Sequence, residues 1–116
     1  MENKKVYDLE ERTYLFAKNC RILVQTFPKT LSNIEDCKQL VRSSGSVAAN
    51  YIEANEKLGD KDFKFRLKIS RKEAKESVLW LKLLKDLNIK LESELTQLLD
   101  EAEELRKILS SIINKI

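Results

Sequence analysis

The residues with the clearest chemical potential are two glutamate pairs at Glu-x-x-Glu spacing, Glu73/Glu76 and Glu101/Glu104. On a helix this spacing places both carboxylates on one face, and carboxylates on facing helices of a bundle can hold metal ions. A di-metal carboxylate centre also needs Glu-x-x-His pairs, and the 116 residues include no histidine. We therefore expect no metal ion and no cofactor.

The two thiols, Cys20 and Cys37, are the remaining candidate nucleophiles. The sequence offers no histidine base, no nucleophile with a base partner and no glycine-rich phosphate loop. Both cysteines fall on predicted core positions, where a free thiol behaves as a small apolar group. We predict that the protein is not an enzyme and has no catalytic residue.

The cysteine content and the first residues indicate the cellular compartment. Two cysteines without a disulfide framework are typical of a reducing environment. The opening MENKKVYDLEE is charged where a secretory segment would be apolar, and the longest apolar run covers only residues 78–81. We expect a cytoplasmic protein with no membrane partner.

The composition favours helices as the elements that position these side chains. Charged residues make up 35% and hydrophobic residues 42% of the chain, with only two glycines and one proline. Pro28, Gly59 and Asn88 mark the breaks, and Asn88 is expected to end a helix in the left-handed conformation. We predict one domain, residues 1–116, with helices at about 6–27, 32–58, 60–88 and 91–115.

The periodicity of small and apolar residues predicts how these helices pack. They recur at steps of three and four, which is the spacing of one buried row. In the second segment this row is Ile34, Cys37, Val41, Ser44, Ala48, Tyr51, Asn55 and Leu58. In the third it is Phe63, Leu67, Ser70, Ala74, Ser77, Leu81 and Leu84.

The residue numbers of facing positions across an antiparallel hairpin add up to a constant. Here this sum is 118 for the second and third segments and 179 for the third and fourth. The pattern predicts an all-α, antiparallel up-down-up-down four-helix bundle with short loops.

The same register places opposite charges across the two middle helices. It predicts ion pairs of Glu53 with Arg66 and of Arg42 with Glu76, with Glu73 as an alternative partner of Arg42. One interpretation is structural, since such pairs fix the register of the helices. The other is a ligand or active-site cluster, because carboxylates with arginine in a bundle can bind metal or phosphate.

Positive charge is concentrated in the third predicted helix. Residues 57–90 contain eleven Lys and Arg against five Asp and Glu, although the net charge of the chain is only +3. A set that we call the basic stripe follows the helical repeat for about 27 Å. It consists of Lys57, Lys61, Lys64, Lys68, Arg71 and Lys75. A nucleic-acid backbone can lie along such a stripe. A solvated lysine face, or one that meets the acidic fourth helix of a neighbouring subunit, is an equal alternative.

Large apolar side chains also occur outside the predicted buried rows. Leu79, Leu83 and Leu87 share one helical face beside Trp80. An apolar surface of this kind is typical of an interface, which a second copy of the chain can supply, and peripheral core packing is the alternative. Gly45, near the middle of the second helix, costs about 1 kcal/mol relative to alanine, which indicates close packing or a bend.

Two stretches carry a family resemblance: QLVRSSGSVAANYIE at 39–53 and KDFKFRLKISRKEAKESVLWL at 61–81. They resemble the four-helix-bundle family of proteins encoded in intervening sequences of 23S ribosomal RNA genes. The matching positions are Arg42, Ser46, Asn50, Glu53, Phe63, Arg66, Glu73, Glu76, Trp80 and Leu81. Many members end the second helix with Ile-Ala-Glu-Gly, whereas this chain has Tyr-Ile-Glu-Ala at 51–54, which predicts that the helix continues to about Leu58.

The resemblance implies a bacterial, non-enzymatic bundle that forms a homo-oligomer, with a ring of five known among relatives. A related branch, the accessory variability proteins of diversity-generating retroelements, comprises basic pentamers that bind nucleic acid and a reverse transcriptase. We accordingly expect a homo-oligomer, a homopentamer by this resemblance, that binds RNA or DNA, with a reverse transcriptase as a further partner in a retroelement. A scaffold or adaptor that binds protein and has no nucleic-acid role is the alternative.

Overall fold

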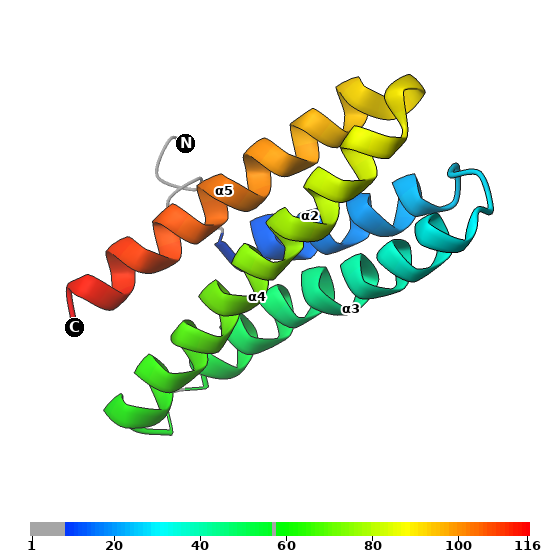
Figure 1. Cartoon of the computed structure of the whole chain (residues 1–116). Coiled ribbons are helices and arrows are strands. Elements are labelled where there is room, and N and C mark those ends of the chain that lie inside the picture. The colour runs from blue at the N-terminus through cyan, green and yellow to red at the C-terminus, as the bar shows by residue number, and fades with distance from the viewer. Residues whose placement is uncertain (1–8, 57) are drawn as a thin grey trace.

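The computed structural model describes residues 9–56 and 58–116, and within these residues it contains four α-helices and no strand (Figure 1). The helices are α2 (Leu9–Val24), α3 (Leu31–Ala54), α4 (Asp60–Leu87) and α5 (Glu92–Asn114), with a short 3-10 turn, η1 (Ile89–Leu91), before α5. Consecutive helices run in opposite directions and lie side by side. The predicted all-α, antiparallel four-helix bundle is confirmed.

The two middle helices, α3 and α4, have the most extensive contact, and among the helix pairs that touch, α2 and α5 have the smallest. Small buried residues bring the backbones of α3 and α4 close together. The Ser43 and Ser77 hydroxyls lie 2.7 Å apart, and the Ser70 hydroxyl donates to the backbone oxygen of Val47 at 2.8 Å. These contacts satisfy hydroxyl groups that would otherwise be buried without partners.

The core is built mainly from leucines of α4 and α5, closed by residues from α2 and α3. Its largest fully buried side chains are Phe16, Leu40, Leu67, Leu81, Leu84, Leu95, Leu105 and Leu109. Burying each contributes about 1.5–3 kcal/mol. Across the described residues, no helix combines the length and apolar character that crossing a membrane requires.

The buried face of α3 differs from the predicted row. Leu58, 79% exposed, lies beyond the end of α3. Within the helix, Ile34 is 38% exposed, whereas Leu40 and Val47, which the row omits, are fully buried. The reason is that α3 contacts α2 as well as α4, so its buried face must serve two neighbours. A single row of alternating steps describes only one of these contacts.

Two helices end clearly earlier than predicted, whereas α4 and α5 end within one residue of the prediction. The first ends at Val24 rather than residue 27, because Pro28 has no N–H to donate to the Val24 carbonyl. The Thr26 hydroxyl donates to the Leu23 carbonyl at 2.7 Å and so satisfies another carbonyl at the helix end. The second ends at Ala54, the last buried residue of α3, instead of continuing to Leu58. The predicted residues 6–8 of the first helix lie outside the described residues.

The ends of α3 and α4 meet through a pair of amides. Asn33 and Asn88 each donate to the side-chain oxygen of the other at 2.9 Å. Asn88 ends α4 with φ −136° and ψ 73°, so the predicted left-handed conformation is wrong. Its amide also donates to the Leu84 carbonyl at 2.8 Å, which satisfies a free carbonyl at the helix end.

Candidate functional site

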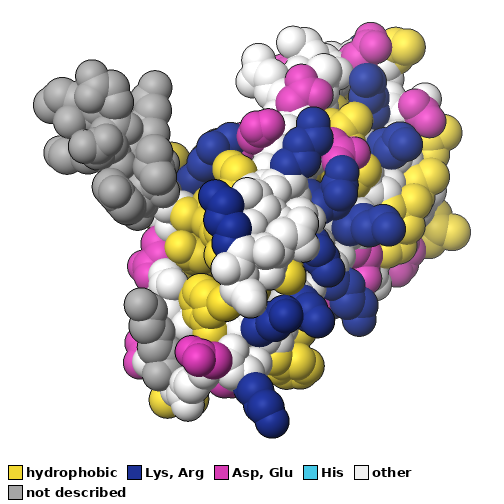
Figure 2. Space-filling view, turned by 90° about the vertical axis from the view of Figure 1, so that its left-hand side faces the viewer, with side chains coloured by type: hydrophobic (Ala, Val, Ile, Leu, Met, Phe, Trp, Pro, Cys, Tyr) yellow, Lys and Arg dark blue, Asp and Glu magenta, His cyan; other side chains and the backbone are white. Residues whose placement is uncertain are grey.

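The described members of the basic stripe lie on α4, and most of them are exposed. Lys61, Lys64, Lys68 and Lys75 point to solvent, and Arg71 is half-buried. Figure 2 shows Lys and Arg side chains gathered in a band across the face that it draws. Lys57, the remaining member, lies outside the described residues. The structure therefore keeps the described cations on the surface.

Three of the five acidic side chains of α4 pair with arginines outside the basic stripe. Asp62 pairs with Arg66 one turn along the same helix, and Glu73 and Glu76 both pair with Arg42 of α3. Among residues 9–56 and 58–116, no salt bridge involves a member of the basic stripe. The described cations of the stripe therefore make no direct ion pair with an acidic side chain in the part of the chain that the structure describes.

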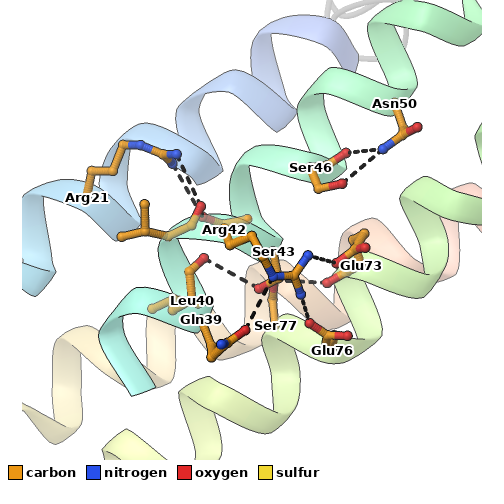
Figure 3. A network of polar contacts seen from close by, with 12 residues as sticks. Arg21, Gln39, Leu40, Arg42, Ser43, Ser46, Asn50, Glu73, Glu76 and Ser77 are labelled. Atoms are coloured by element: carbon orange, nitrogen blue, oxygen red, sulfur yellow. Dashed lines mark hydrogen bonds and ion pairs between the residues drawn. The ribbon is translucent and has the colours of Figure 1, made fainter. Parts of the chain in front are cut away.

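Arg42 holds the first glutamate pair between α3 and α4 (Figure 3). Its Nη2 bonds to Glu76, its Nη1 lies 3.3 Å from Glu73 Oε1, and its Nε donates to Gln39 Oε1 at 3.3 Å. Glu73 is buried, and its Oε1 accepts no hydrogen bond from the described residues, so this contact is Coulombic. The register brings Arg42 to both glutamates, and one guanidinium serving two carboxylates supports the structural interpretation.

One glutamate of the second pair, Glu101, also binds an arginine. Arg12 of α2 donates to the two oxygens of Glu101 at 2.7 and 2.9 Å, a bidentate pair that joins the first and last helices. The hydrogen bond to Glu101 raises the pKa of Arg12. No cluster of three or more Cys, Asp or Glu side chains suited to a metal ion occurs in the described part of the chain.

The predicted pair of Glu53 with Arg66 does not form. Arg66 instead lies with its Nε 3.6 Å from Asp62 and its Nη1 3.5 Å from the Asn50 side-chain oxygen. Asp62 is four residues away on the same helix, so it reaches Arg66 without depending on the geometry of the turn. The local partner is therefore preferred over the partner across the hairpin.

The apolar set on the second half of α4 divides into two groups. Leu79, Leu83 and Leu87, which we call the leucine patch, are 48%, 37% and 62% exposed. Trp80 packs against the core instead, and its indole nitrogen is buried without a hydrogen-bond partner among the described residues. The three leucines are exposed enough to form an interface. Trp80, predicted to lie beside them at the interface, packs mainly against the core of the bundle.

Comparison with known proteins places this arrangement in a family. A family model described as 23S rRNA-intervening sequence protein matches residues 5–111. The chain belongs to this family. It is also similar to a solved structure, a protein with unknown function from the S23 ribosomal protein family of Bacteroides thetaiotaomicron, determined at 1.70 Å. The TM-score is 0.78 at 28% sequence identity, and the match covers 90% of this chain and 96% of that chain.

No curated protein matches this member of the 23S rRNA-intervening sequence family. Neither the family description nor the name of the solved relative states an enzymatic activity. The family therefore confirms the resemblance seen in the sequence and the fold.

Sequence reasoning missed two cations of this family member. Lys72 and Arg106 line a cavity between α4 and α5 together with residues of the basic stripe. Lys72 falls between the helical steps used to define the stripe, and Arg106 belongs to α5, which is acidic overall. A signal was available, because the sum of 179 for α4 and α5 places Arg106 opposite residue 73, beside Lys72.

The cysteines of this family member are free thiols within the bundle. Cys20 is fully buried, and burial raises its pKa from 9.0 to about 12. Cys37 is half-buried, and its pKa is raised mainly by burial and further by Asp36. Because the reactive species is the thiolate, both environments suppress nucleophilic chemistry, in accord with the predicted apolar role.

Proposed function

We propose that this family member is a non-enzymatic, homo-oligomeric bundle that binds the phosphate backbone of RNA or DNA through the basic stripe. The proposal rests chiefly on one observation, which is that the described cations of the stripe have no salt-bridge partner among residues 9–56 and 58–116. Lysines aligned along an exposed helix face match a backbone of regularly spaced phosphates, and such contacts carry no sequence information.

A salt titration tests the nucleic-acid role. We expect a single-stranded RNA of about 20 nucleotides to bind at about 50 mM salt, with log affinity falling linearly against log salt. Contact with three to five phosphates predicts a slope of about −2 to −3.5, because each phosphate contact releases about 0.7 counterion from a single strand. An absence of binding at low salt, or an affinity that does not change with salt, contradicts the proposal.

Charge reversal separates the stripe from the net charge of the protein. Replacing Lys61, Lys64 and Lys68 together by Glu should abolish measurable RNA binding. The matched control replaces three exposed lysines of α2, α3 and the loop between them by Glu, namely Lys18, Lys29 and Lys38. Both triple variants change the net charge equally, so a role of the stripe predicts that only the first loses binding.

The leucine patch supports self-association as the second part of the proposal. Three leucines at four-residue spacing expose apolar surface that a second copy can cover. Light scattering should give a mass that is a multiple of 13.5 kDa. The double substitution of Leu79 and Leu83 by Lys should reduce this mass, whereas Tyr14→Lys on α2, also an exposed site, should not. A strictly monomeric wild-type protein contradicts this part.

The exposed leucines also favour the second candidate function, a protein-binding scaffold without a nucleic-acid role. The two functions predict different results for one preparation. A nucleic-acid binder purified at low salt should carry bound nucleic acid, so its absorbance at about 260 nm should be high relative to the protein absorbance at about 280 nm. The variant with Glu at Lys61, Lys64 and Lys68 should lose this excess absorbance. A scaffold should purify free of nucleic acid and bind no RNA at any salt concentration.

A further inference from the structure

A cavity between α4 and α5 has a lining that is almost entirely cationic. Its volume is about 330 Å³, and its lining residues are Lys68, Arg71, Lys72, Lys75, Arg106 and Ser110. Five of these six residues carry a positive charge, the sixth is a hydroxyl donor, and no carboxylate is among them. The volume falls at the lower end of the range for small-molecule sites, about 300–1,000 Å³.

The two arginines of the cavity are held in place by side chains of α5. Arg71 of α4 donates from Nη1 to the Ser110 hydroxyl at 3.3 Å, which joins the two helices at the cavity. Arg106 donates from Nε to Glu103 Oε1 at 3.0 Å, one turn before it on α5. Within the described residues, the terminal nitrogens of Arg106 make no hydrogen bond, so they are free to donate to a ligand.

The lysines of the cavity crowd like charges onto one helix. Lys68 and Lys72, and likewise Arg71 and Lys75, are separated by four residues, where like charges destabilise a helix. In the described part of the chain no salt bridge relieves this repulsion. A bound anion would relieve it, and the guanidinium groups supply paired N–H donors that suit the oxygens of a phosphate.

We propose that this cavity binds a phosphate group, either one in an RNA or DNA backbone or one on a small phosphorylated molecule. The nucleic-acid source rests on the function proposed above, which it deepens by adding Lys72, Arg106 and Ser110 to the contact surface. The cavity then fixes one phosphate between two helices, while the rest of the stripe follows the backbone outward. The phosphate chemistry itself does not depend on which source supplies the group.

The test compares two neighbouring residues of α5 in the full chain. Arg106→Gln removes a charge from the cavity, and Lys107→Gln removes one from an exposed position outside it. The two probes are pyrophosphate and the single-stranded RNA described above. Binding of pyrophosphate is measured by calorimetry in a buffer without phosphate. We expect Arg106→Gln to weaken binding of both probes about tenfold and Lys107→Gln to weaken it less than about twofold. Lys72→Gln, at an exposed site, should match Arg106→Gln and provides a second variant that does not disturb the core.

The outcomes separate the cavity from the stripe. If pyrophosphate displaces RNA and both probes follow the expected order of variants, the phosphate belongs to a nucleic acid. If pyrophosphate follows this order but RNA does not bind, the cavity serves a small phosphorylated molecule and the proposed function fails. If RNA binds in a salt-dependent way but the two α5 variants are equal for both probes, the cavity inference is overturned and the proposed function stands. If neither probe binds, both are overturned.

Discussion

The guanidinium of Arg21 on α2 lies over the backbone of Gly45 on α3, such that a Cβ built on Gly45 would sit 2.8 Å from Arg21 Nη2. From this position Nη2 donates to the Val41 carbonyl at 3.1 Å, and Nη1 donates to the Ala17 carbonyl at 3.1 Å. The glycine leaves room for an arginine from the neighbouring helix. Of the two explanations that the sequence offered for Gly45, the contact supports close packing.

This relationship predicts coupling between the two positions. Gly45→Ala should stabilise an Arg21→Ala background by about 1 kcal/mol, which is the difference in helix propensity. In the wild-type background the gain should be smaller, because the new methyl group displaces the Arg21 guanidinium from Val41. Urea unfolding of the four proteins of the cycle measures the difference. An equal effect of Gly45→Ala in both backgrounds contradicts the contact.

Arg42 should matter more to folding than its exposure indicates. Arg42→Glu should destabilise the bundle by about 1–3 kcal/mol, because it leaves the buried Glu73 without its partner and adds a third carboxylate nearby. Adding Glu76→Lys should recover part of this loss by restoring an opposite charge across α3 and α4. The measurement is chemical unfolding of both single variants and the double variant.

The exposed pair of Glu35 and Lys38 on α3 provides the control for Arg42. Both side chains are more than half exposed, and their charges lie 3.8 Å apart. Lys38→Glu should change the free energy of unfolding by less than about 1 kcal/mol, since pairs on the surface contribute little. If it costs as much as Arg42→Glu, or if Arg42→Glu and Glu76→Lys act independently, the bridge between the helices does not stabilise the fold.

The hairpin of α3 and α4 shows what the sequence predicts well. The observed contacts Arg42–Glu76 and Ser43–Ser77 have position sums of 118 and 120, close to the predicted 118, because a short turn fixes the register. Glu53 and Arg66 fit this register too, yet they do not pair. The register predicts which residues lie near one another across the hairpin. Which ion pairs form also depends on competing partners on the same helix, here Asp62 for Arg66.

The surface between α4 and α5 shows why the candidate site was harder to predict. Periodicity along one helix identifies the basic stripe, whereas the cavity needs Arg106 of α5, which is a cation on a mostly acidic helix. The exposed Ile34 and the buried Leu40 illustrate the same limit in the core. A single row of periodic residues on a helix predicts its packing against one neighbour. Residues that pack against a second neighbour can be predicted only when the arrangement of the helices in space is known.

The amide pair of Asn33 and Asn88 should be sensitive to a change of a single atom. Asn33→Asp keeps the size of the side chain but removes the N–H groups that donate to Asn88 and to the Pro28 carbonyl at 2.9 and 3.0 Å. Because Asn33 is only 3% exposed, we expect a loss of about 1–3 kcal/mol in the free energy of unfolding. Asn19→Asp, at an exposed position of α2, should cost less than about 0.5 kcal/mol. Equal effects of the two substitutions would show that the amides are not coupled.

The two thiols should differ strongly in reactivity. Burial raises the pKa of Cys20 from 9.0 to about 12. At about pH 8 its thiolate fraction is therefore about a thousandfold below that of an unperturbed thiol, in addition to its steric protection. In the native protein, we expect an aromatic disulfide reagent to modify Cys37 and to reach Cys20 only after unfolding in guanidinium chloride. A Cys37→Ser variant, which keeps only Cys20, should be inert until it is unfolded, and rapid reaction of this variant in the native state contradicts the buried position.

The raised pKa of Cys20 also predicts a dependence of stability on pH. The folded state binds the thiol proton more tightly than the unfolded state, in which the pKa stays near 9.0. The contribution of the neutral thiol is therefore present in full below about pH 9 and is lost as the pH rises from about 9 toward 12. Cys20→Ala removes this titration, so its free energy of unfolding should fall less steeply than that of the wild-type protein over this range. Chemical unfolding at several pH values measures both slopes, and identical slopes would show that the Cys20 thiol ionises equally well in the folded state.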